Sequence, residues 1–202
     1  MIKLQIDLLR HGETTLSHTL RGHLDDDLTE QGWLQMQSTI QQHITTPMDW
    51  DVIISSPLRR CHCFAEHLAN QLGLPMRVNE HIKEMHFGDW EGIPTQTIYE
   101  IAPELLANFW QFPTQYHAPK GESLLQFKQR VIDGFDEIYI QMQRHNWNKA
   151  LIVTHGGVIK LLTCLARQQN LDDLLKMPAE LGKLYQLECS KRLDEMYFEE
   201  KH

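Results

Sequence analysis

Two histidines and two arginines follow short apolar segments of this chain. Each segment leads directly into cationic, hydroxyl or glycine residues: 3–9 into Arg10-His11-Gly12, 52–54 into Ser-Ser-Pro-Leu-Arg59-Arg60, and 151–153 into Thr154-His155-Gly156-Gly157. Imidazole is a nucleophile toward phosphorus, and its unprotonated form is well populated at neutral pH. Arginine forks hold phosphoryl oxygens bidentately and stay charged at every relevant pH. The four side chains therefore predict chemistry on a phosphoryl group.

Glycines accompany these cations. Gly12, Gly156 and Gly157 would let the backbone approach the same anion, and a helix after Gly157 would direct its N-terminus toward it. His11 is the candidate nucleophile.

The reaction also needs a group that protonates the leaving alkoxide. Glu84 is the best candidate, because Met85, Phe87 and Trp90 follow it closely, and an apolar neighbourhood favours a protonated carboxyl. Glu13 and Glu91 are the alternatives.

The elements that must position these residues are strands alternating with helices. Residues 3–9 alternate polar and apolar side chains, and 52–54 and 151–153 are short apolar runs, which is typical of strands. Apolar residues recur at helical spacing in three segments. The first begins after Thr29, and the second begins after Ser56, which would be its N-cap with Pro57 in the first turn. The third begins after Ser123, which would form a capping box with Gln126. The pattern predicts an α/β three-layer sandwich, whose mostly parallel sheet is covered by helices on both faces.

Two further segments have a different character. Residues 93–120 contain four prolines with aromatic residues between them, which predicts short helices forming a cap-like insertion within a single domain of residues 1–202. Phe109 and Phe112 in it are as consistent with core packing as with substrate contact. Residues 184–198 are expected to form one or two edge strands.

Composition excludes several classes of protein. The net charge of −8 argues against a broad nucleic-acid surface, and no apolar run is long enough to span a membrane. The N-terminal residues lack the uninterrupted apolar segment of a signal peptide, so we expect a cytoplasmic protein. The four cysteines form no CxxC pair, and His62, Glu66 and His67 lack a metalloprotease spacing, so neither a metal nor another cofactor is predicted.

Five segments, taken in order, resemble the histidine phosphatase superfamily, also called phosphoglycerate mutase-like. They are the Arg-His-Gly-Glu-Thr stretch 10–14, residues 22–29, the turn 55–60, Gly121-Glu122-Ser123, and 154–157. The similarity extends over nearly the whole chain. Asp27 departs from the family's usual proline, and Ser17 from a common asparagine.

The resemblance implies a phosphohistidine intermediate on His11 and Glu84 as the proton donor. It also implies that Arg10, Arg60 and His155 bind the phosphoryl group, and that Arg59 is a solvated neighbour. The implied substrate contacts are Arg10, Gly12, Thr14, Ser17, Arg60, Glu84 and Gly156.

Several functions are compatible with these residues. The leading hypothesis is a phosphomonoesterase acting on a small phosphorylated metabolite. Within the superfamily, residues 84–92 and the small cap are most similar to α-ribazole-5′-phosphate phosphatases of cobalamin biosynthesis. The absence of lysine and arginine from residues 93–119 favours a neutral or apolar leaving group. A phosphoglycerate mutase-type isomerase, a broad-specificity phosphatase and a catalytically dead phospholigand-binding module are the alternatives.

Overall fold

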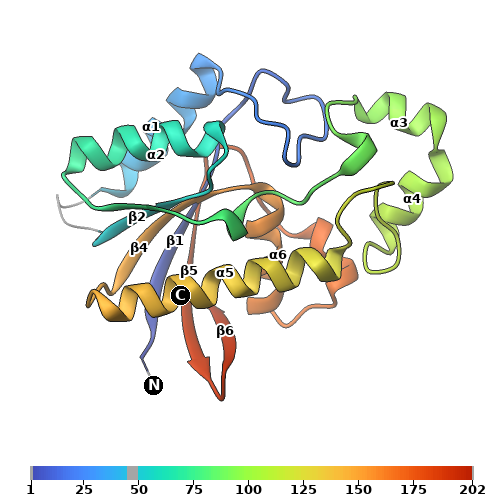
Figure 1. Ribbon diagram of the computed structural model, residues 1–202. Coiled ribbons are helices and arrows are strands. Elements are labelled where there is room, and N and C mark those ends of the chain that lie inside the picture. The colour runs from blue at the N-terminus through green and yellow to red at the C-terminus, as the bar shows by residue number, and fades with distance from the viewer. Residues whose placement is uncertain (1, 45–49, 202) are drawn as a thin grey trace.

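A six-stranded sheet forms the centre of the computed structural model, which describes residues 2–44 and 50–201 (Figure 1). The strand order is β3-β2-β4-β1-β5-β6. The strands are β1 (Leu4–Arg10), β2 (Val52–Ser55), β3 (Met76–Val78), β4 (Lys149–Thr154), β5 (Leu184–Arg192) and β6 (Glu195–Glu200). The first four are parallel to one another, whereas β5 and β6 add an antiparallel edge. The expectation of a mostly parallel sheet is confirmed, as are the two strands near the C-terminus; β3 was not predicted.

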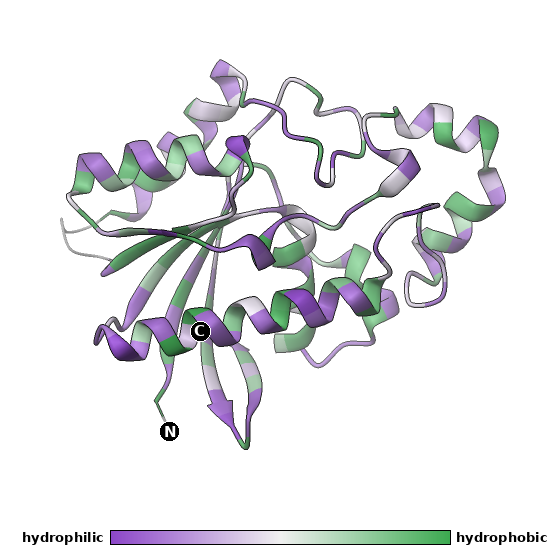
Figure 2. Ribbon diagram, viewed as in Figure 1, coloured by the Kyte–Doolittle hydropathy of each residue, from purple (hydrophilic) through white to green (hydrophobic). Residues whose placement is uncertain are grey.

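Helices cover both faces of this sheet, as expected for a three-layer α/β sandwich. On one face lie α1 (Glu30–His43) and α2 (Arg59–Leu72), and on the other α5 (Leu124–Arg144) and α6 (Gly156–Ala166). Strands β2 and β4 are almost wholly buried, because helices pack against both of their sides. Figure 2 shows the consequence for hydropathy: the central strands are hydrophobic, while α1 and α5 alternate hydrophobic and hydrophilic stripes.

Local sequence signals account for two helix starts. Thr29 is the N-cap of α1, and its side chain accepts the N–H of Gly32. Ser123 is the N-cap of α5 and forms the expected capping box with Gln126. Both signals act between residues three apart in the chain, so they need no tertiary partner to operate.

The predicted start of α2 is wrong. The helix begins at Arg59 rather than after Ser56, and its N-cap, Leu58, makes no side-chain hydrogen bond. The Asp25 carboxylate, distant in sequence, accepts the N–H of Arg59 at 2.7 Å. The Ser56 hydroxyl lies 2.7 Å from His155 Nε2 and accepts the N–H of Leu58 at 3.4 Å.

The proline-rich segment contains two short helices, α3 (Thr95–Ile101) and α4 (Pro103–Gln111), at the end of the molecule remote from the chain's N-terminus (Figure 1). Short 3-10 helices complete the connections: η1 (Glu80–Ile82), η2 (Gly88–Trp90) and η3 (Leu171–Lys176). Within the described ranges, no helix is long and apolar enough to cross a membrane.

Candidate active site

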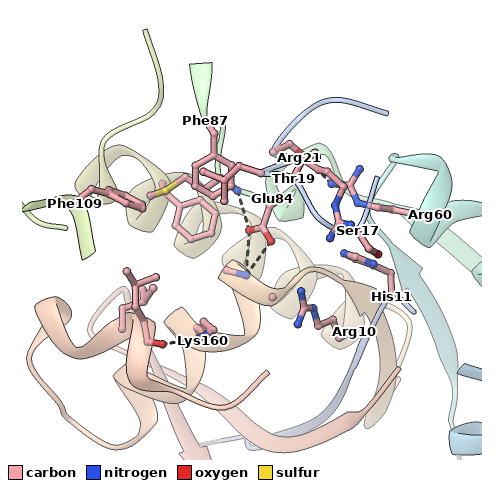
Figure 3. Close-up of a pocket in the computed structure, with 18 of the residues that line it drawn as sticks. Arg10, His11, Ser17, Thr19, Arg21, Arg60, Glu84, Phe87, Phe109 and Lys160 are labelled. Atoms are coloured by element: carbon pink, nitrogen blue, oxygen red, sulfur yellow. Dashed lines mark hydrogen bonds between the residues drawn. The ribbon is translucent and has the colours of Figure 1, made fainter. Parts of the chain in front are cut away.

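A cavity of about 300 Å³ lies where β1 and β4 end, roofed by residues of α4 and of the segment after η1 (Figure 3). One part of its wall is cationic, from Arg10, Arg21, Arg60 and Lys160, and Glu84 is its carboxylate. Another part is apolar, formed by Met85, Phe87, Phe109, Trp110 and Phe127. The cavity therefore combines an anion-binding region with a surface suited to a hydrophobic group.

Sheet register brings the two histidines together. Arg10 pairs with Thr154 across the parallel strands β1 and β4, so the next residue of each strand, His11 and His155, emerges at the same level. Their ring centroids are 5.3 Å apart in an edge-on arrangement. The convergence expected from strand ends is present in the structure.

His11 has the tautomer that a nucleophile requires. Its Nδ1 lies 2.8 Å from the carbonyl oxygen of Gly12, which accepts only, so Nδ1 carries the proton and Nε2 keeps its lone pair. The ring is almost completely buried. Burial and the positive charges of Arg60 and Arg10 lower the pKa of His11 well below its usual value, so the ring is neutral at neutral pH.

His155 is held from the opposite side. Its Nε2 lies 2.7 Å from the hydroxyl of Ser56, and its ring is fully buried beside the thiol of Cys61. Burial, then Arg60 and His11, lower the pKa of His155 well below its usual value. Both imidazoles are therefore neutral at neutral pH.

Arg10 and Arg60 each keep an unused donor. The Nε of each is buried with no hydrogen-bond partner among the described residues. Buried polar groups are normally paired, and an unpaired guanidinium N–H is costly. The two donors are therefore available for an anion in the cavity, and Figure 3 shows His11 beside both arginines.

The remaining nitrogens of Arg60 are held by one loop. They donate to the carbonyl oxygens of Gly22 and Leu24, at 2.7 and 2.8 Å, and Asp26 lies at 3.3 Å. The Glu91 carboxylate accepts the N–H groups of His23 and Leu24 at 2.7 Å, which orders the same loop. Neighbouring Arg59 points to solvent and pairs with Asp27, as expected for a solvated residue.

Glu84 occupies the N-terminus of α6. Both of its carboxylate oxygens accept the N–H of Gly157, at 3.1 and 3.0 Å, and Oε1 also accepts the N–H of Met85 at 3.0 Å. Arg130 fixes the backbone of this segment by donating to the carbonyl oxygens of His81, Lys83 and Glu84. The N-terminus of α6 thus lies at the cavity, as expected, and Glu84 takes one of its N–H groups, that of Gly157.

Two glycines at this terminus are required by close packing. A Cβ on Gly157 would lie 2.1 Å from the Glu84 carboxylate, and one on Gly156 would lie 3.0 Å from the guanidinium carbon of Arg10. Any larger residue at Gly157 would displace Glu84. Both glycines also line the cavity, so they leave room for Glu84 and Arg10 at its edge.

Not every predicted contact residue reaches the cavity. Ser17 and Gly156 line it, whereas Gly12, Thr14 and the fully buried His155 do not. Gly12 packs against the backbone of Gly32 in α1, where a Cβ would lie 2.0 Å from a carbonyl oxygen. Thr14 is buried and accepts a hydrogen bond from Arg21 at 2.6 Å. Gly12 and Thr14 thus support the residues that form the cavity wall and do not face the cavity themselves.

Arg21 and Lys160 line the cavity but were not predicted. Lys160 had a detectable signal, since it follows Gly156 by four residues and so lies on the same face of the helix. Arg21 is in an irregular loop and had none. Phe109 is buried and lines the cavity, whereas Phe112 is 38% exposed and does not line it.

The family model for the histidine phosphatase superfamily (branch 1) matches residues 6–196. The chain belongs to this superfamily. A Hydrogenobacter thermophilus protein, provisionally named phosphoserine phosphatase 2, is 28% identical over 83% of this chain and 80% of its own length. Glucosyl-3-phosphoglycerate phosphatase of Mycolicibacterium vanbaalenii is 28% identical over 77% of this chain and 71% of its own.

A solved structure shares the fold. The α-ribazole phosphatase of Shigella flexneri superposes with a TM-score of 0.76 at 22% identity, covering 98% of this chain and 95% of that one. Family membership and the phosphatase relatives make this protein a phosphatase.

In the part of the chain that the structure describes, no group of three or more His, Cys, Asp or Glu side chains could hold a metal ion.

Proposed function

We propose that this histidine phosphatase is a phosphomonoesterase that acts through a phosphohistidine intermediate on His11. One observation carries the proposal: a neutral imidazole with a free Nε2 stands beside two arginines, each with a buried, unpartnered Nε–H. Those donors would hold the phosphoryl oxygens while Nε2 attacks phosphorus in line with the leaving oxygen.

The reaction would run in two steps. In the first, the bond from His11 Nε2 to phosphorus forms, the bond to the leaving oxygen breaks, and that oxygen takes a proton from Glu84. In the second, Glu84 takes a proton from water, whose oxygen attacks phosphorus and releases His11 and inorganic phosphate. His155 lies behind the cavity wall with its Nε2 on the Ser56 hydroxyl, and it would bind the phosphoryl group by exchanging that contact for a phosphoryl oxygen.

The cap would supply much of the substrate's selectivity. In the proposed arrangement, residues 1–202 form one domain and residues 93–120 cover the cavity. The aromatic wall supports a flat apolar leaving group, as in α-ribazole 5′-phosphate, the candidate suggested by family resemblance. The Shigella flexneri protein bears that name, but its similarity extends only to the fold.

A second candidate is a phosphomonoester of a carboxylic acid. The argument for a neutral leaving group relied on the lack of basic residues between 93 and 119, yet Arg21 and Lys160 bring positive charge to the cavity from elsewhere. Two relatives carry names that refer to such phosphorylated acids. Hydrolysis rather than phosphoglycerate isomerisation is proposed for either candidate.

The intermediate can be trapped. After brief reaction with ³²P-labelled substrate and an acid-free quench, label should be found on His11 and should be acid-labile but base-stable. His11→Ala should lose both the label and turnover. Near-normal turnover by His11→Ala would refute the mechanism.

A further inference from the structure

Lys160 is the one lysine that lines the cavity within the described residues. It projects from α6, and its Nζ donates to the carbonyl oxygen of Leu175 at 2.6 Å. An ammonium group has three N–H donors, so this bond leaves two of them for other partners. No carboxylate of the described chain lies within 4.0 Å of it.

The position of Lys160 separates it from the attacking group. In the view of Figure 3, Arg10 lies between Lys160 and the pair formed by His11 and Arg60. Gly157, whose N–H bonds Glu84, precedes Lys160 by three residues on α6, so the two residues share a face of that helix. Lys160 is thus near the proton donor, where the leaving group must be.

The charges of the cavity and of a bound phosphoryl group leave one positive charge without a counter-ion. Four cations line the cavity, and Glu84 and the Asp26 carboxylate beside Arg60 offset two of them. A phosphoryl dianion would offset the other two while Glu84 is ionised. Glu84 must however carry a proton to act as an acid, and one positive charge then remains.

We infer that Lys160 binds a second anionic group of the substrate, a carboxylate on the leaving alcohol. This inference rests on the proposed phosphatase function and names its substrate class: phosphomonoesters of small hydroxy acids. Leu174, Leu175 and Phe109 also line the cavity, and an apolar surrounding strengthens such a contact. The second candidate substrate is thereby favoured over α-ribazole 5′-phosphate.

Two pairs of matched substrates measure the effect of the carboxylate on kcat/KM. The pair 3-phosphoglycerate and glycerol 3-phosphate differs only in a carboxylate replacing a hydroxymethyl group, and phosphoserine and phosphoethanolamine differ only in a carboxylate. For wild-type enzyme, kcat/KM should be about tenfold or more higher for the acid of each pair, the usual size of a charged hydrogen bond. α-Ribazole 5′-phosphate should fall below 3-phosphoglycerate.

Variants assign that preference to Lys160. In Lys160→Met the acid-to-neutral ratio of kcat/KM should drop by about tenfold, whereas Lys160→Arg should retain it. Lys176→Met is the matched control: Lys176 is exposed, pairs with Asp173 and does not line the cavity, so its ratio should equal that of wild type. If Lys160→Met does not fold, Lys160→Gln provides the same comparison with a donor retained for Leu175.

Calorimetric binding of the same ligands separates the two proposals. An acid preference in Kd that depends on Lys160, in an enzyme without turnover, would support this inference and refute the proposed hydrolysis. Equal kcat/KM for acid and neutral substrates in wild type, or a ratio unchanged in Lys160→Met, would overturn the role of Lys160 and leave the phosphatase mechanism intact.

Discussion

Both carboxylate oxygens of Glu84 accept the backbone N–H of Gly157, at 3.1 and 3.0 Å. This contact places the proposed proton donor at the N-terminus of α6, next to Arg10 across Gly156. Glutamine at position 84 would keep an oxygen for that N–H but could not give up a proton.

Glu84→Gln should therefore slow the enzyme according to its leaving group. We expect a loss of about 10²- to 10⁴-fold in kcat/KM for an alkyl phosphate, the usual contribution of general acid catalysis. For p-nitrophenyl phosphate the loss should be far smaller, because its phenolate departs unaided. Equal losses would remove the acid role from Glu84. Glu13 and Glu91 are poor substitutes, since neither lines the cavity.

Arg130 should act as a positioning residue for Glu84. It donates to three carbonyl oxygens of residues 81–84 and pairs with Glu122 at 2.7 Å. In Arg130→Met the segment loses these bonds, so alkyl phosphates should again be affected more than p-nitrophenyl phosphate. The control is Arg144→Met, an exposed arginine on the same helix. A uniform loss on both substrates would indicate a merely structural role.

The buried histidines predict how stability depends on pH. Because the pKa values of His11 and His155 are lowered in the folded state, the unfolded chain binds more protons below its own histidine pKa of about 6.5. Their contribution is complete above that value and is lost as pH falls toward the folded-state pKa values. The free energy of unfolding should fall by up to about 1.4 kcal/mol per pH unit for each histidine.

Urea titrations between pH 7 and pH 5 would measure this slope. His155→Gln removes one of the two groups, so its slope should be shallower than that of wild type. An identical slope in the two proteins would show that His155 does not titrate as the structure indicates.

Activity should survive exhaustive chelation. Arg10, Arg21 and Arg60 supply the positive charge that a divalent ion would otherwise provide to the phosphoryl group. Turnover of p-nitrophenyl phosphate should be equal before and after treatment with EDTA and after magnesium is added back. Activity that appears only with added metal would contradict this description of the site.

The sequence alone determined the parts of this protein that depend on neighbours in the chain. Thr29 and Ser123 cap their helices through residues three positions away, and alternating strands and helices imply a mostly parallel sheet. In such a sheet the carboxyl ends of strands share one edge. The sequence therefore suffices to predict that Arg10, His11 and His155 lie at one site.

Only the tertiary structure decided which partner each polar group takes. The Ser56 hydroxyl lies closer to His155 than to the N–H of Leu58 in its own helix cap, and the Gly157 N–H bonds Glu84 rather than remaining free. Lys160 and Arg21 enter the cavity because α6 and an irregular loop pack there. Each choice depends on groups distant in sequence that compete for the same donor or space. Local propensity contains no information on that competition, because it is settled only when the chain is packed.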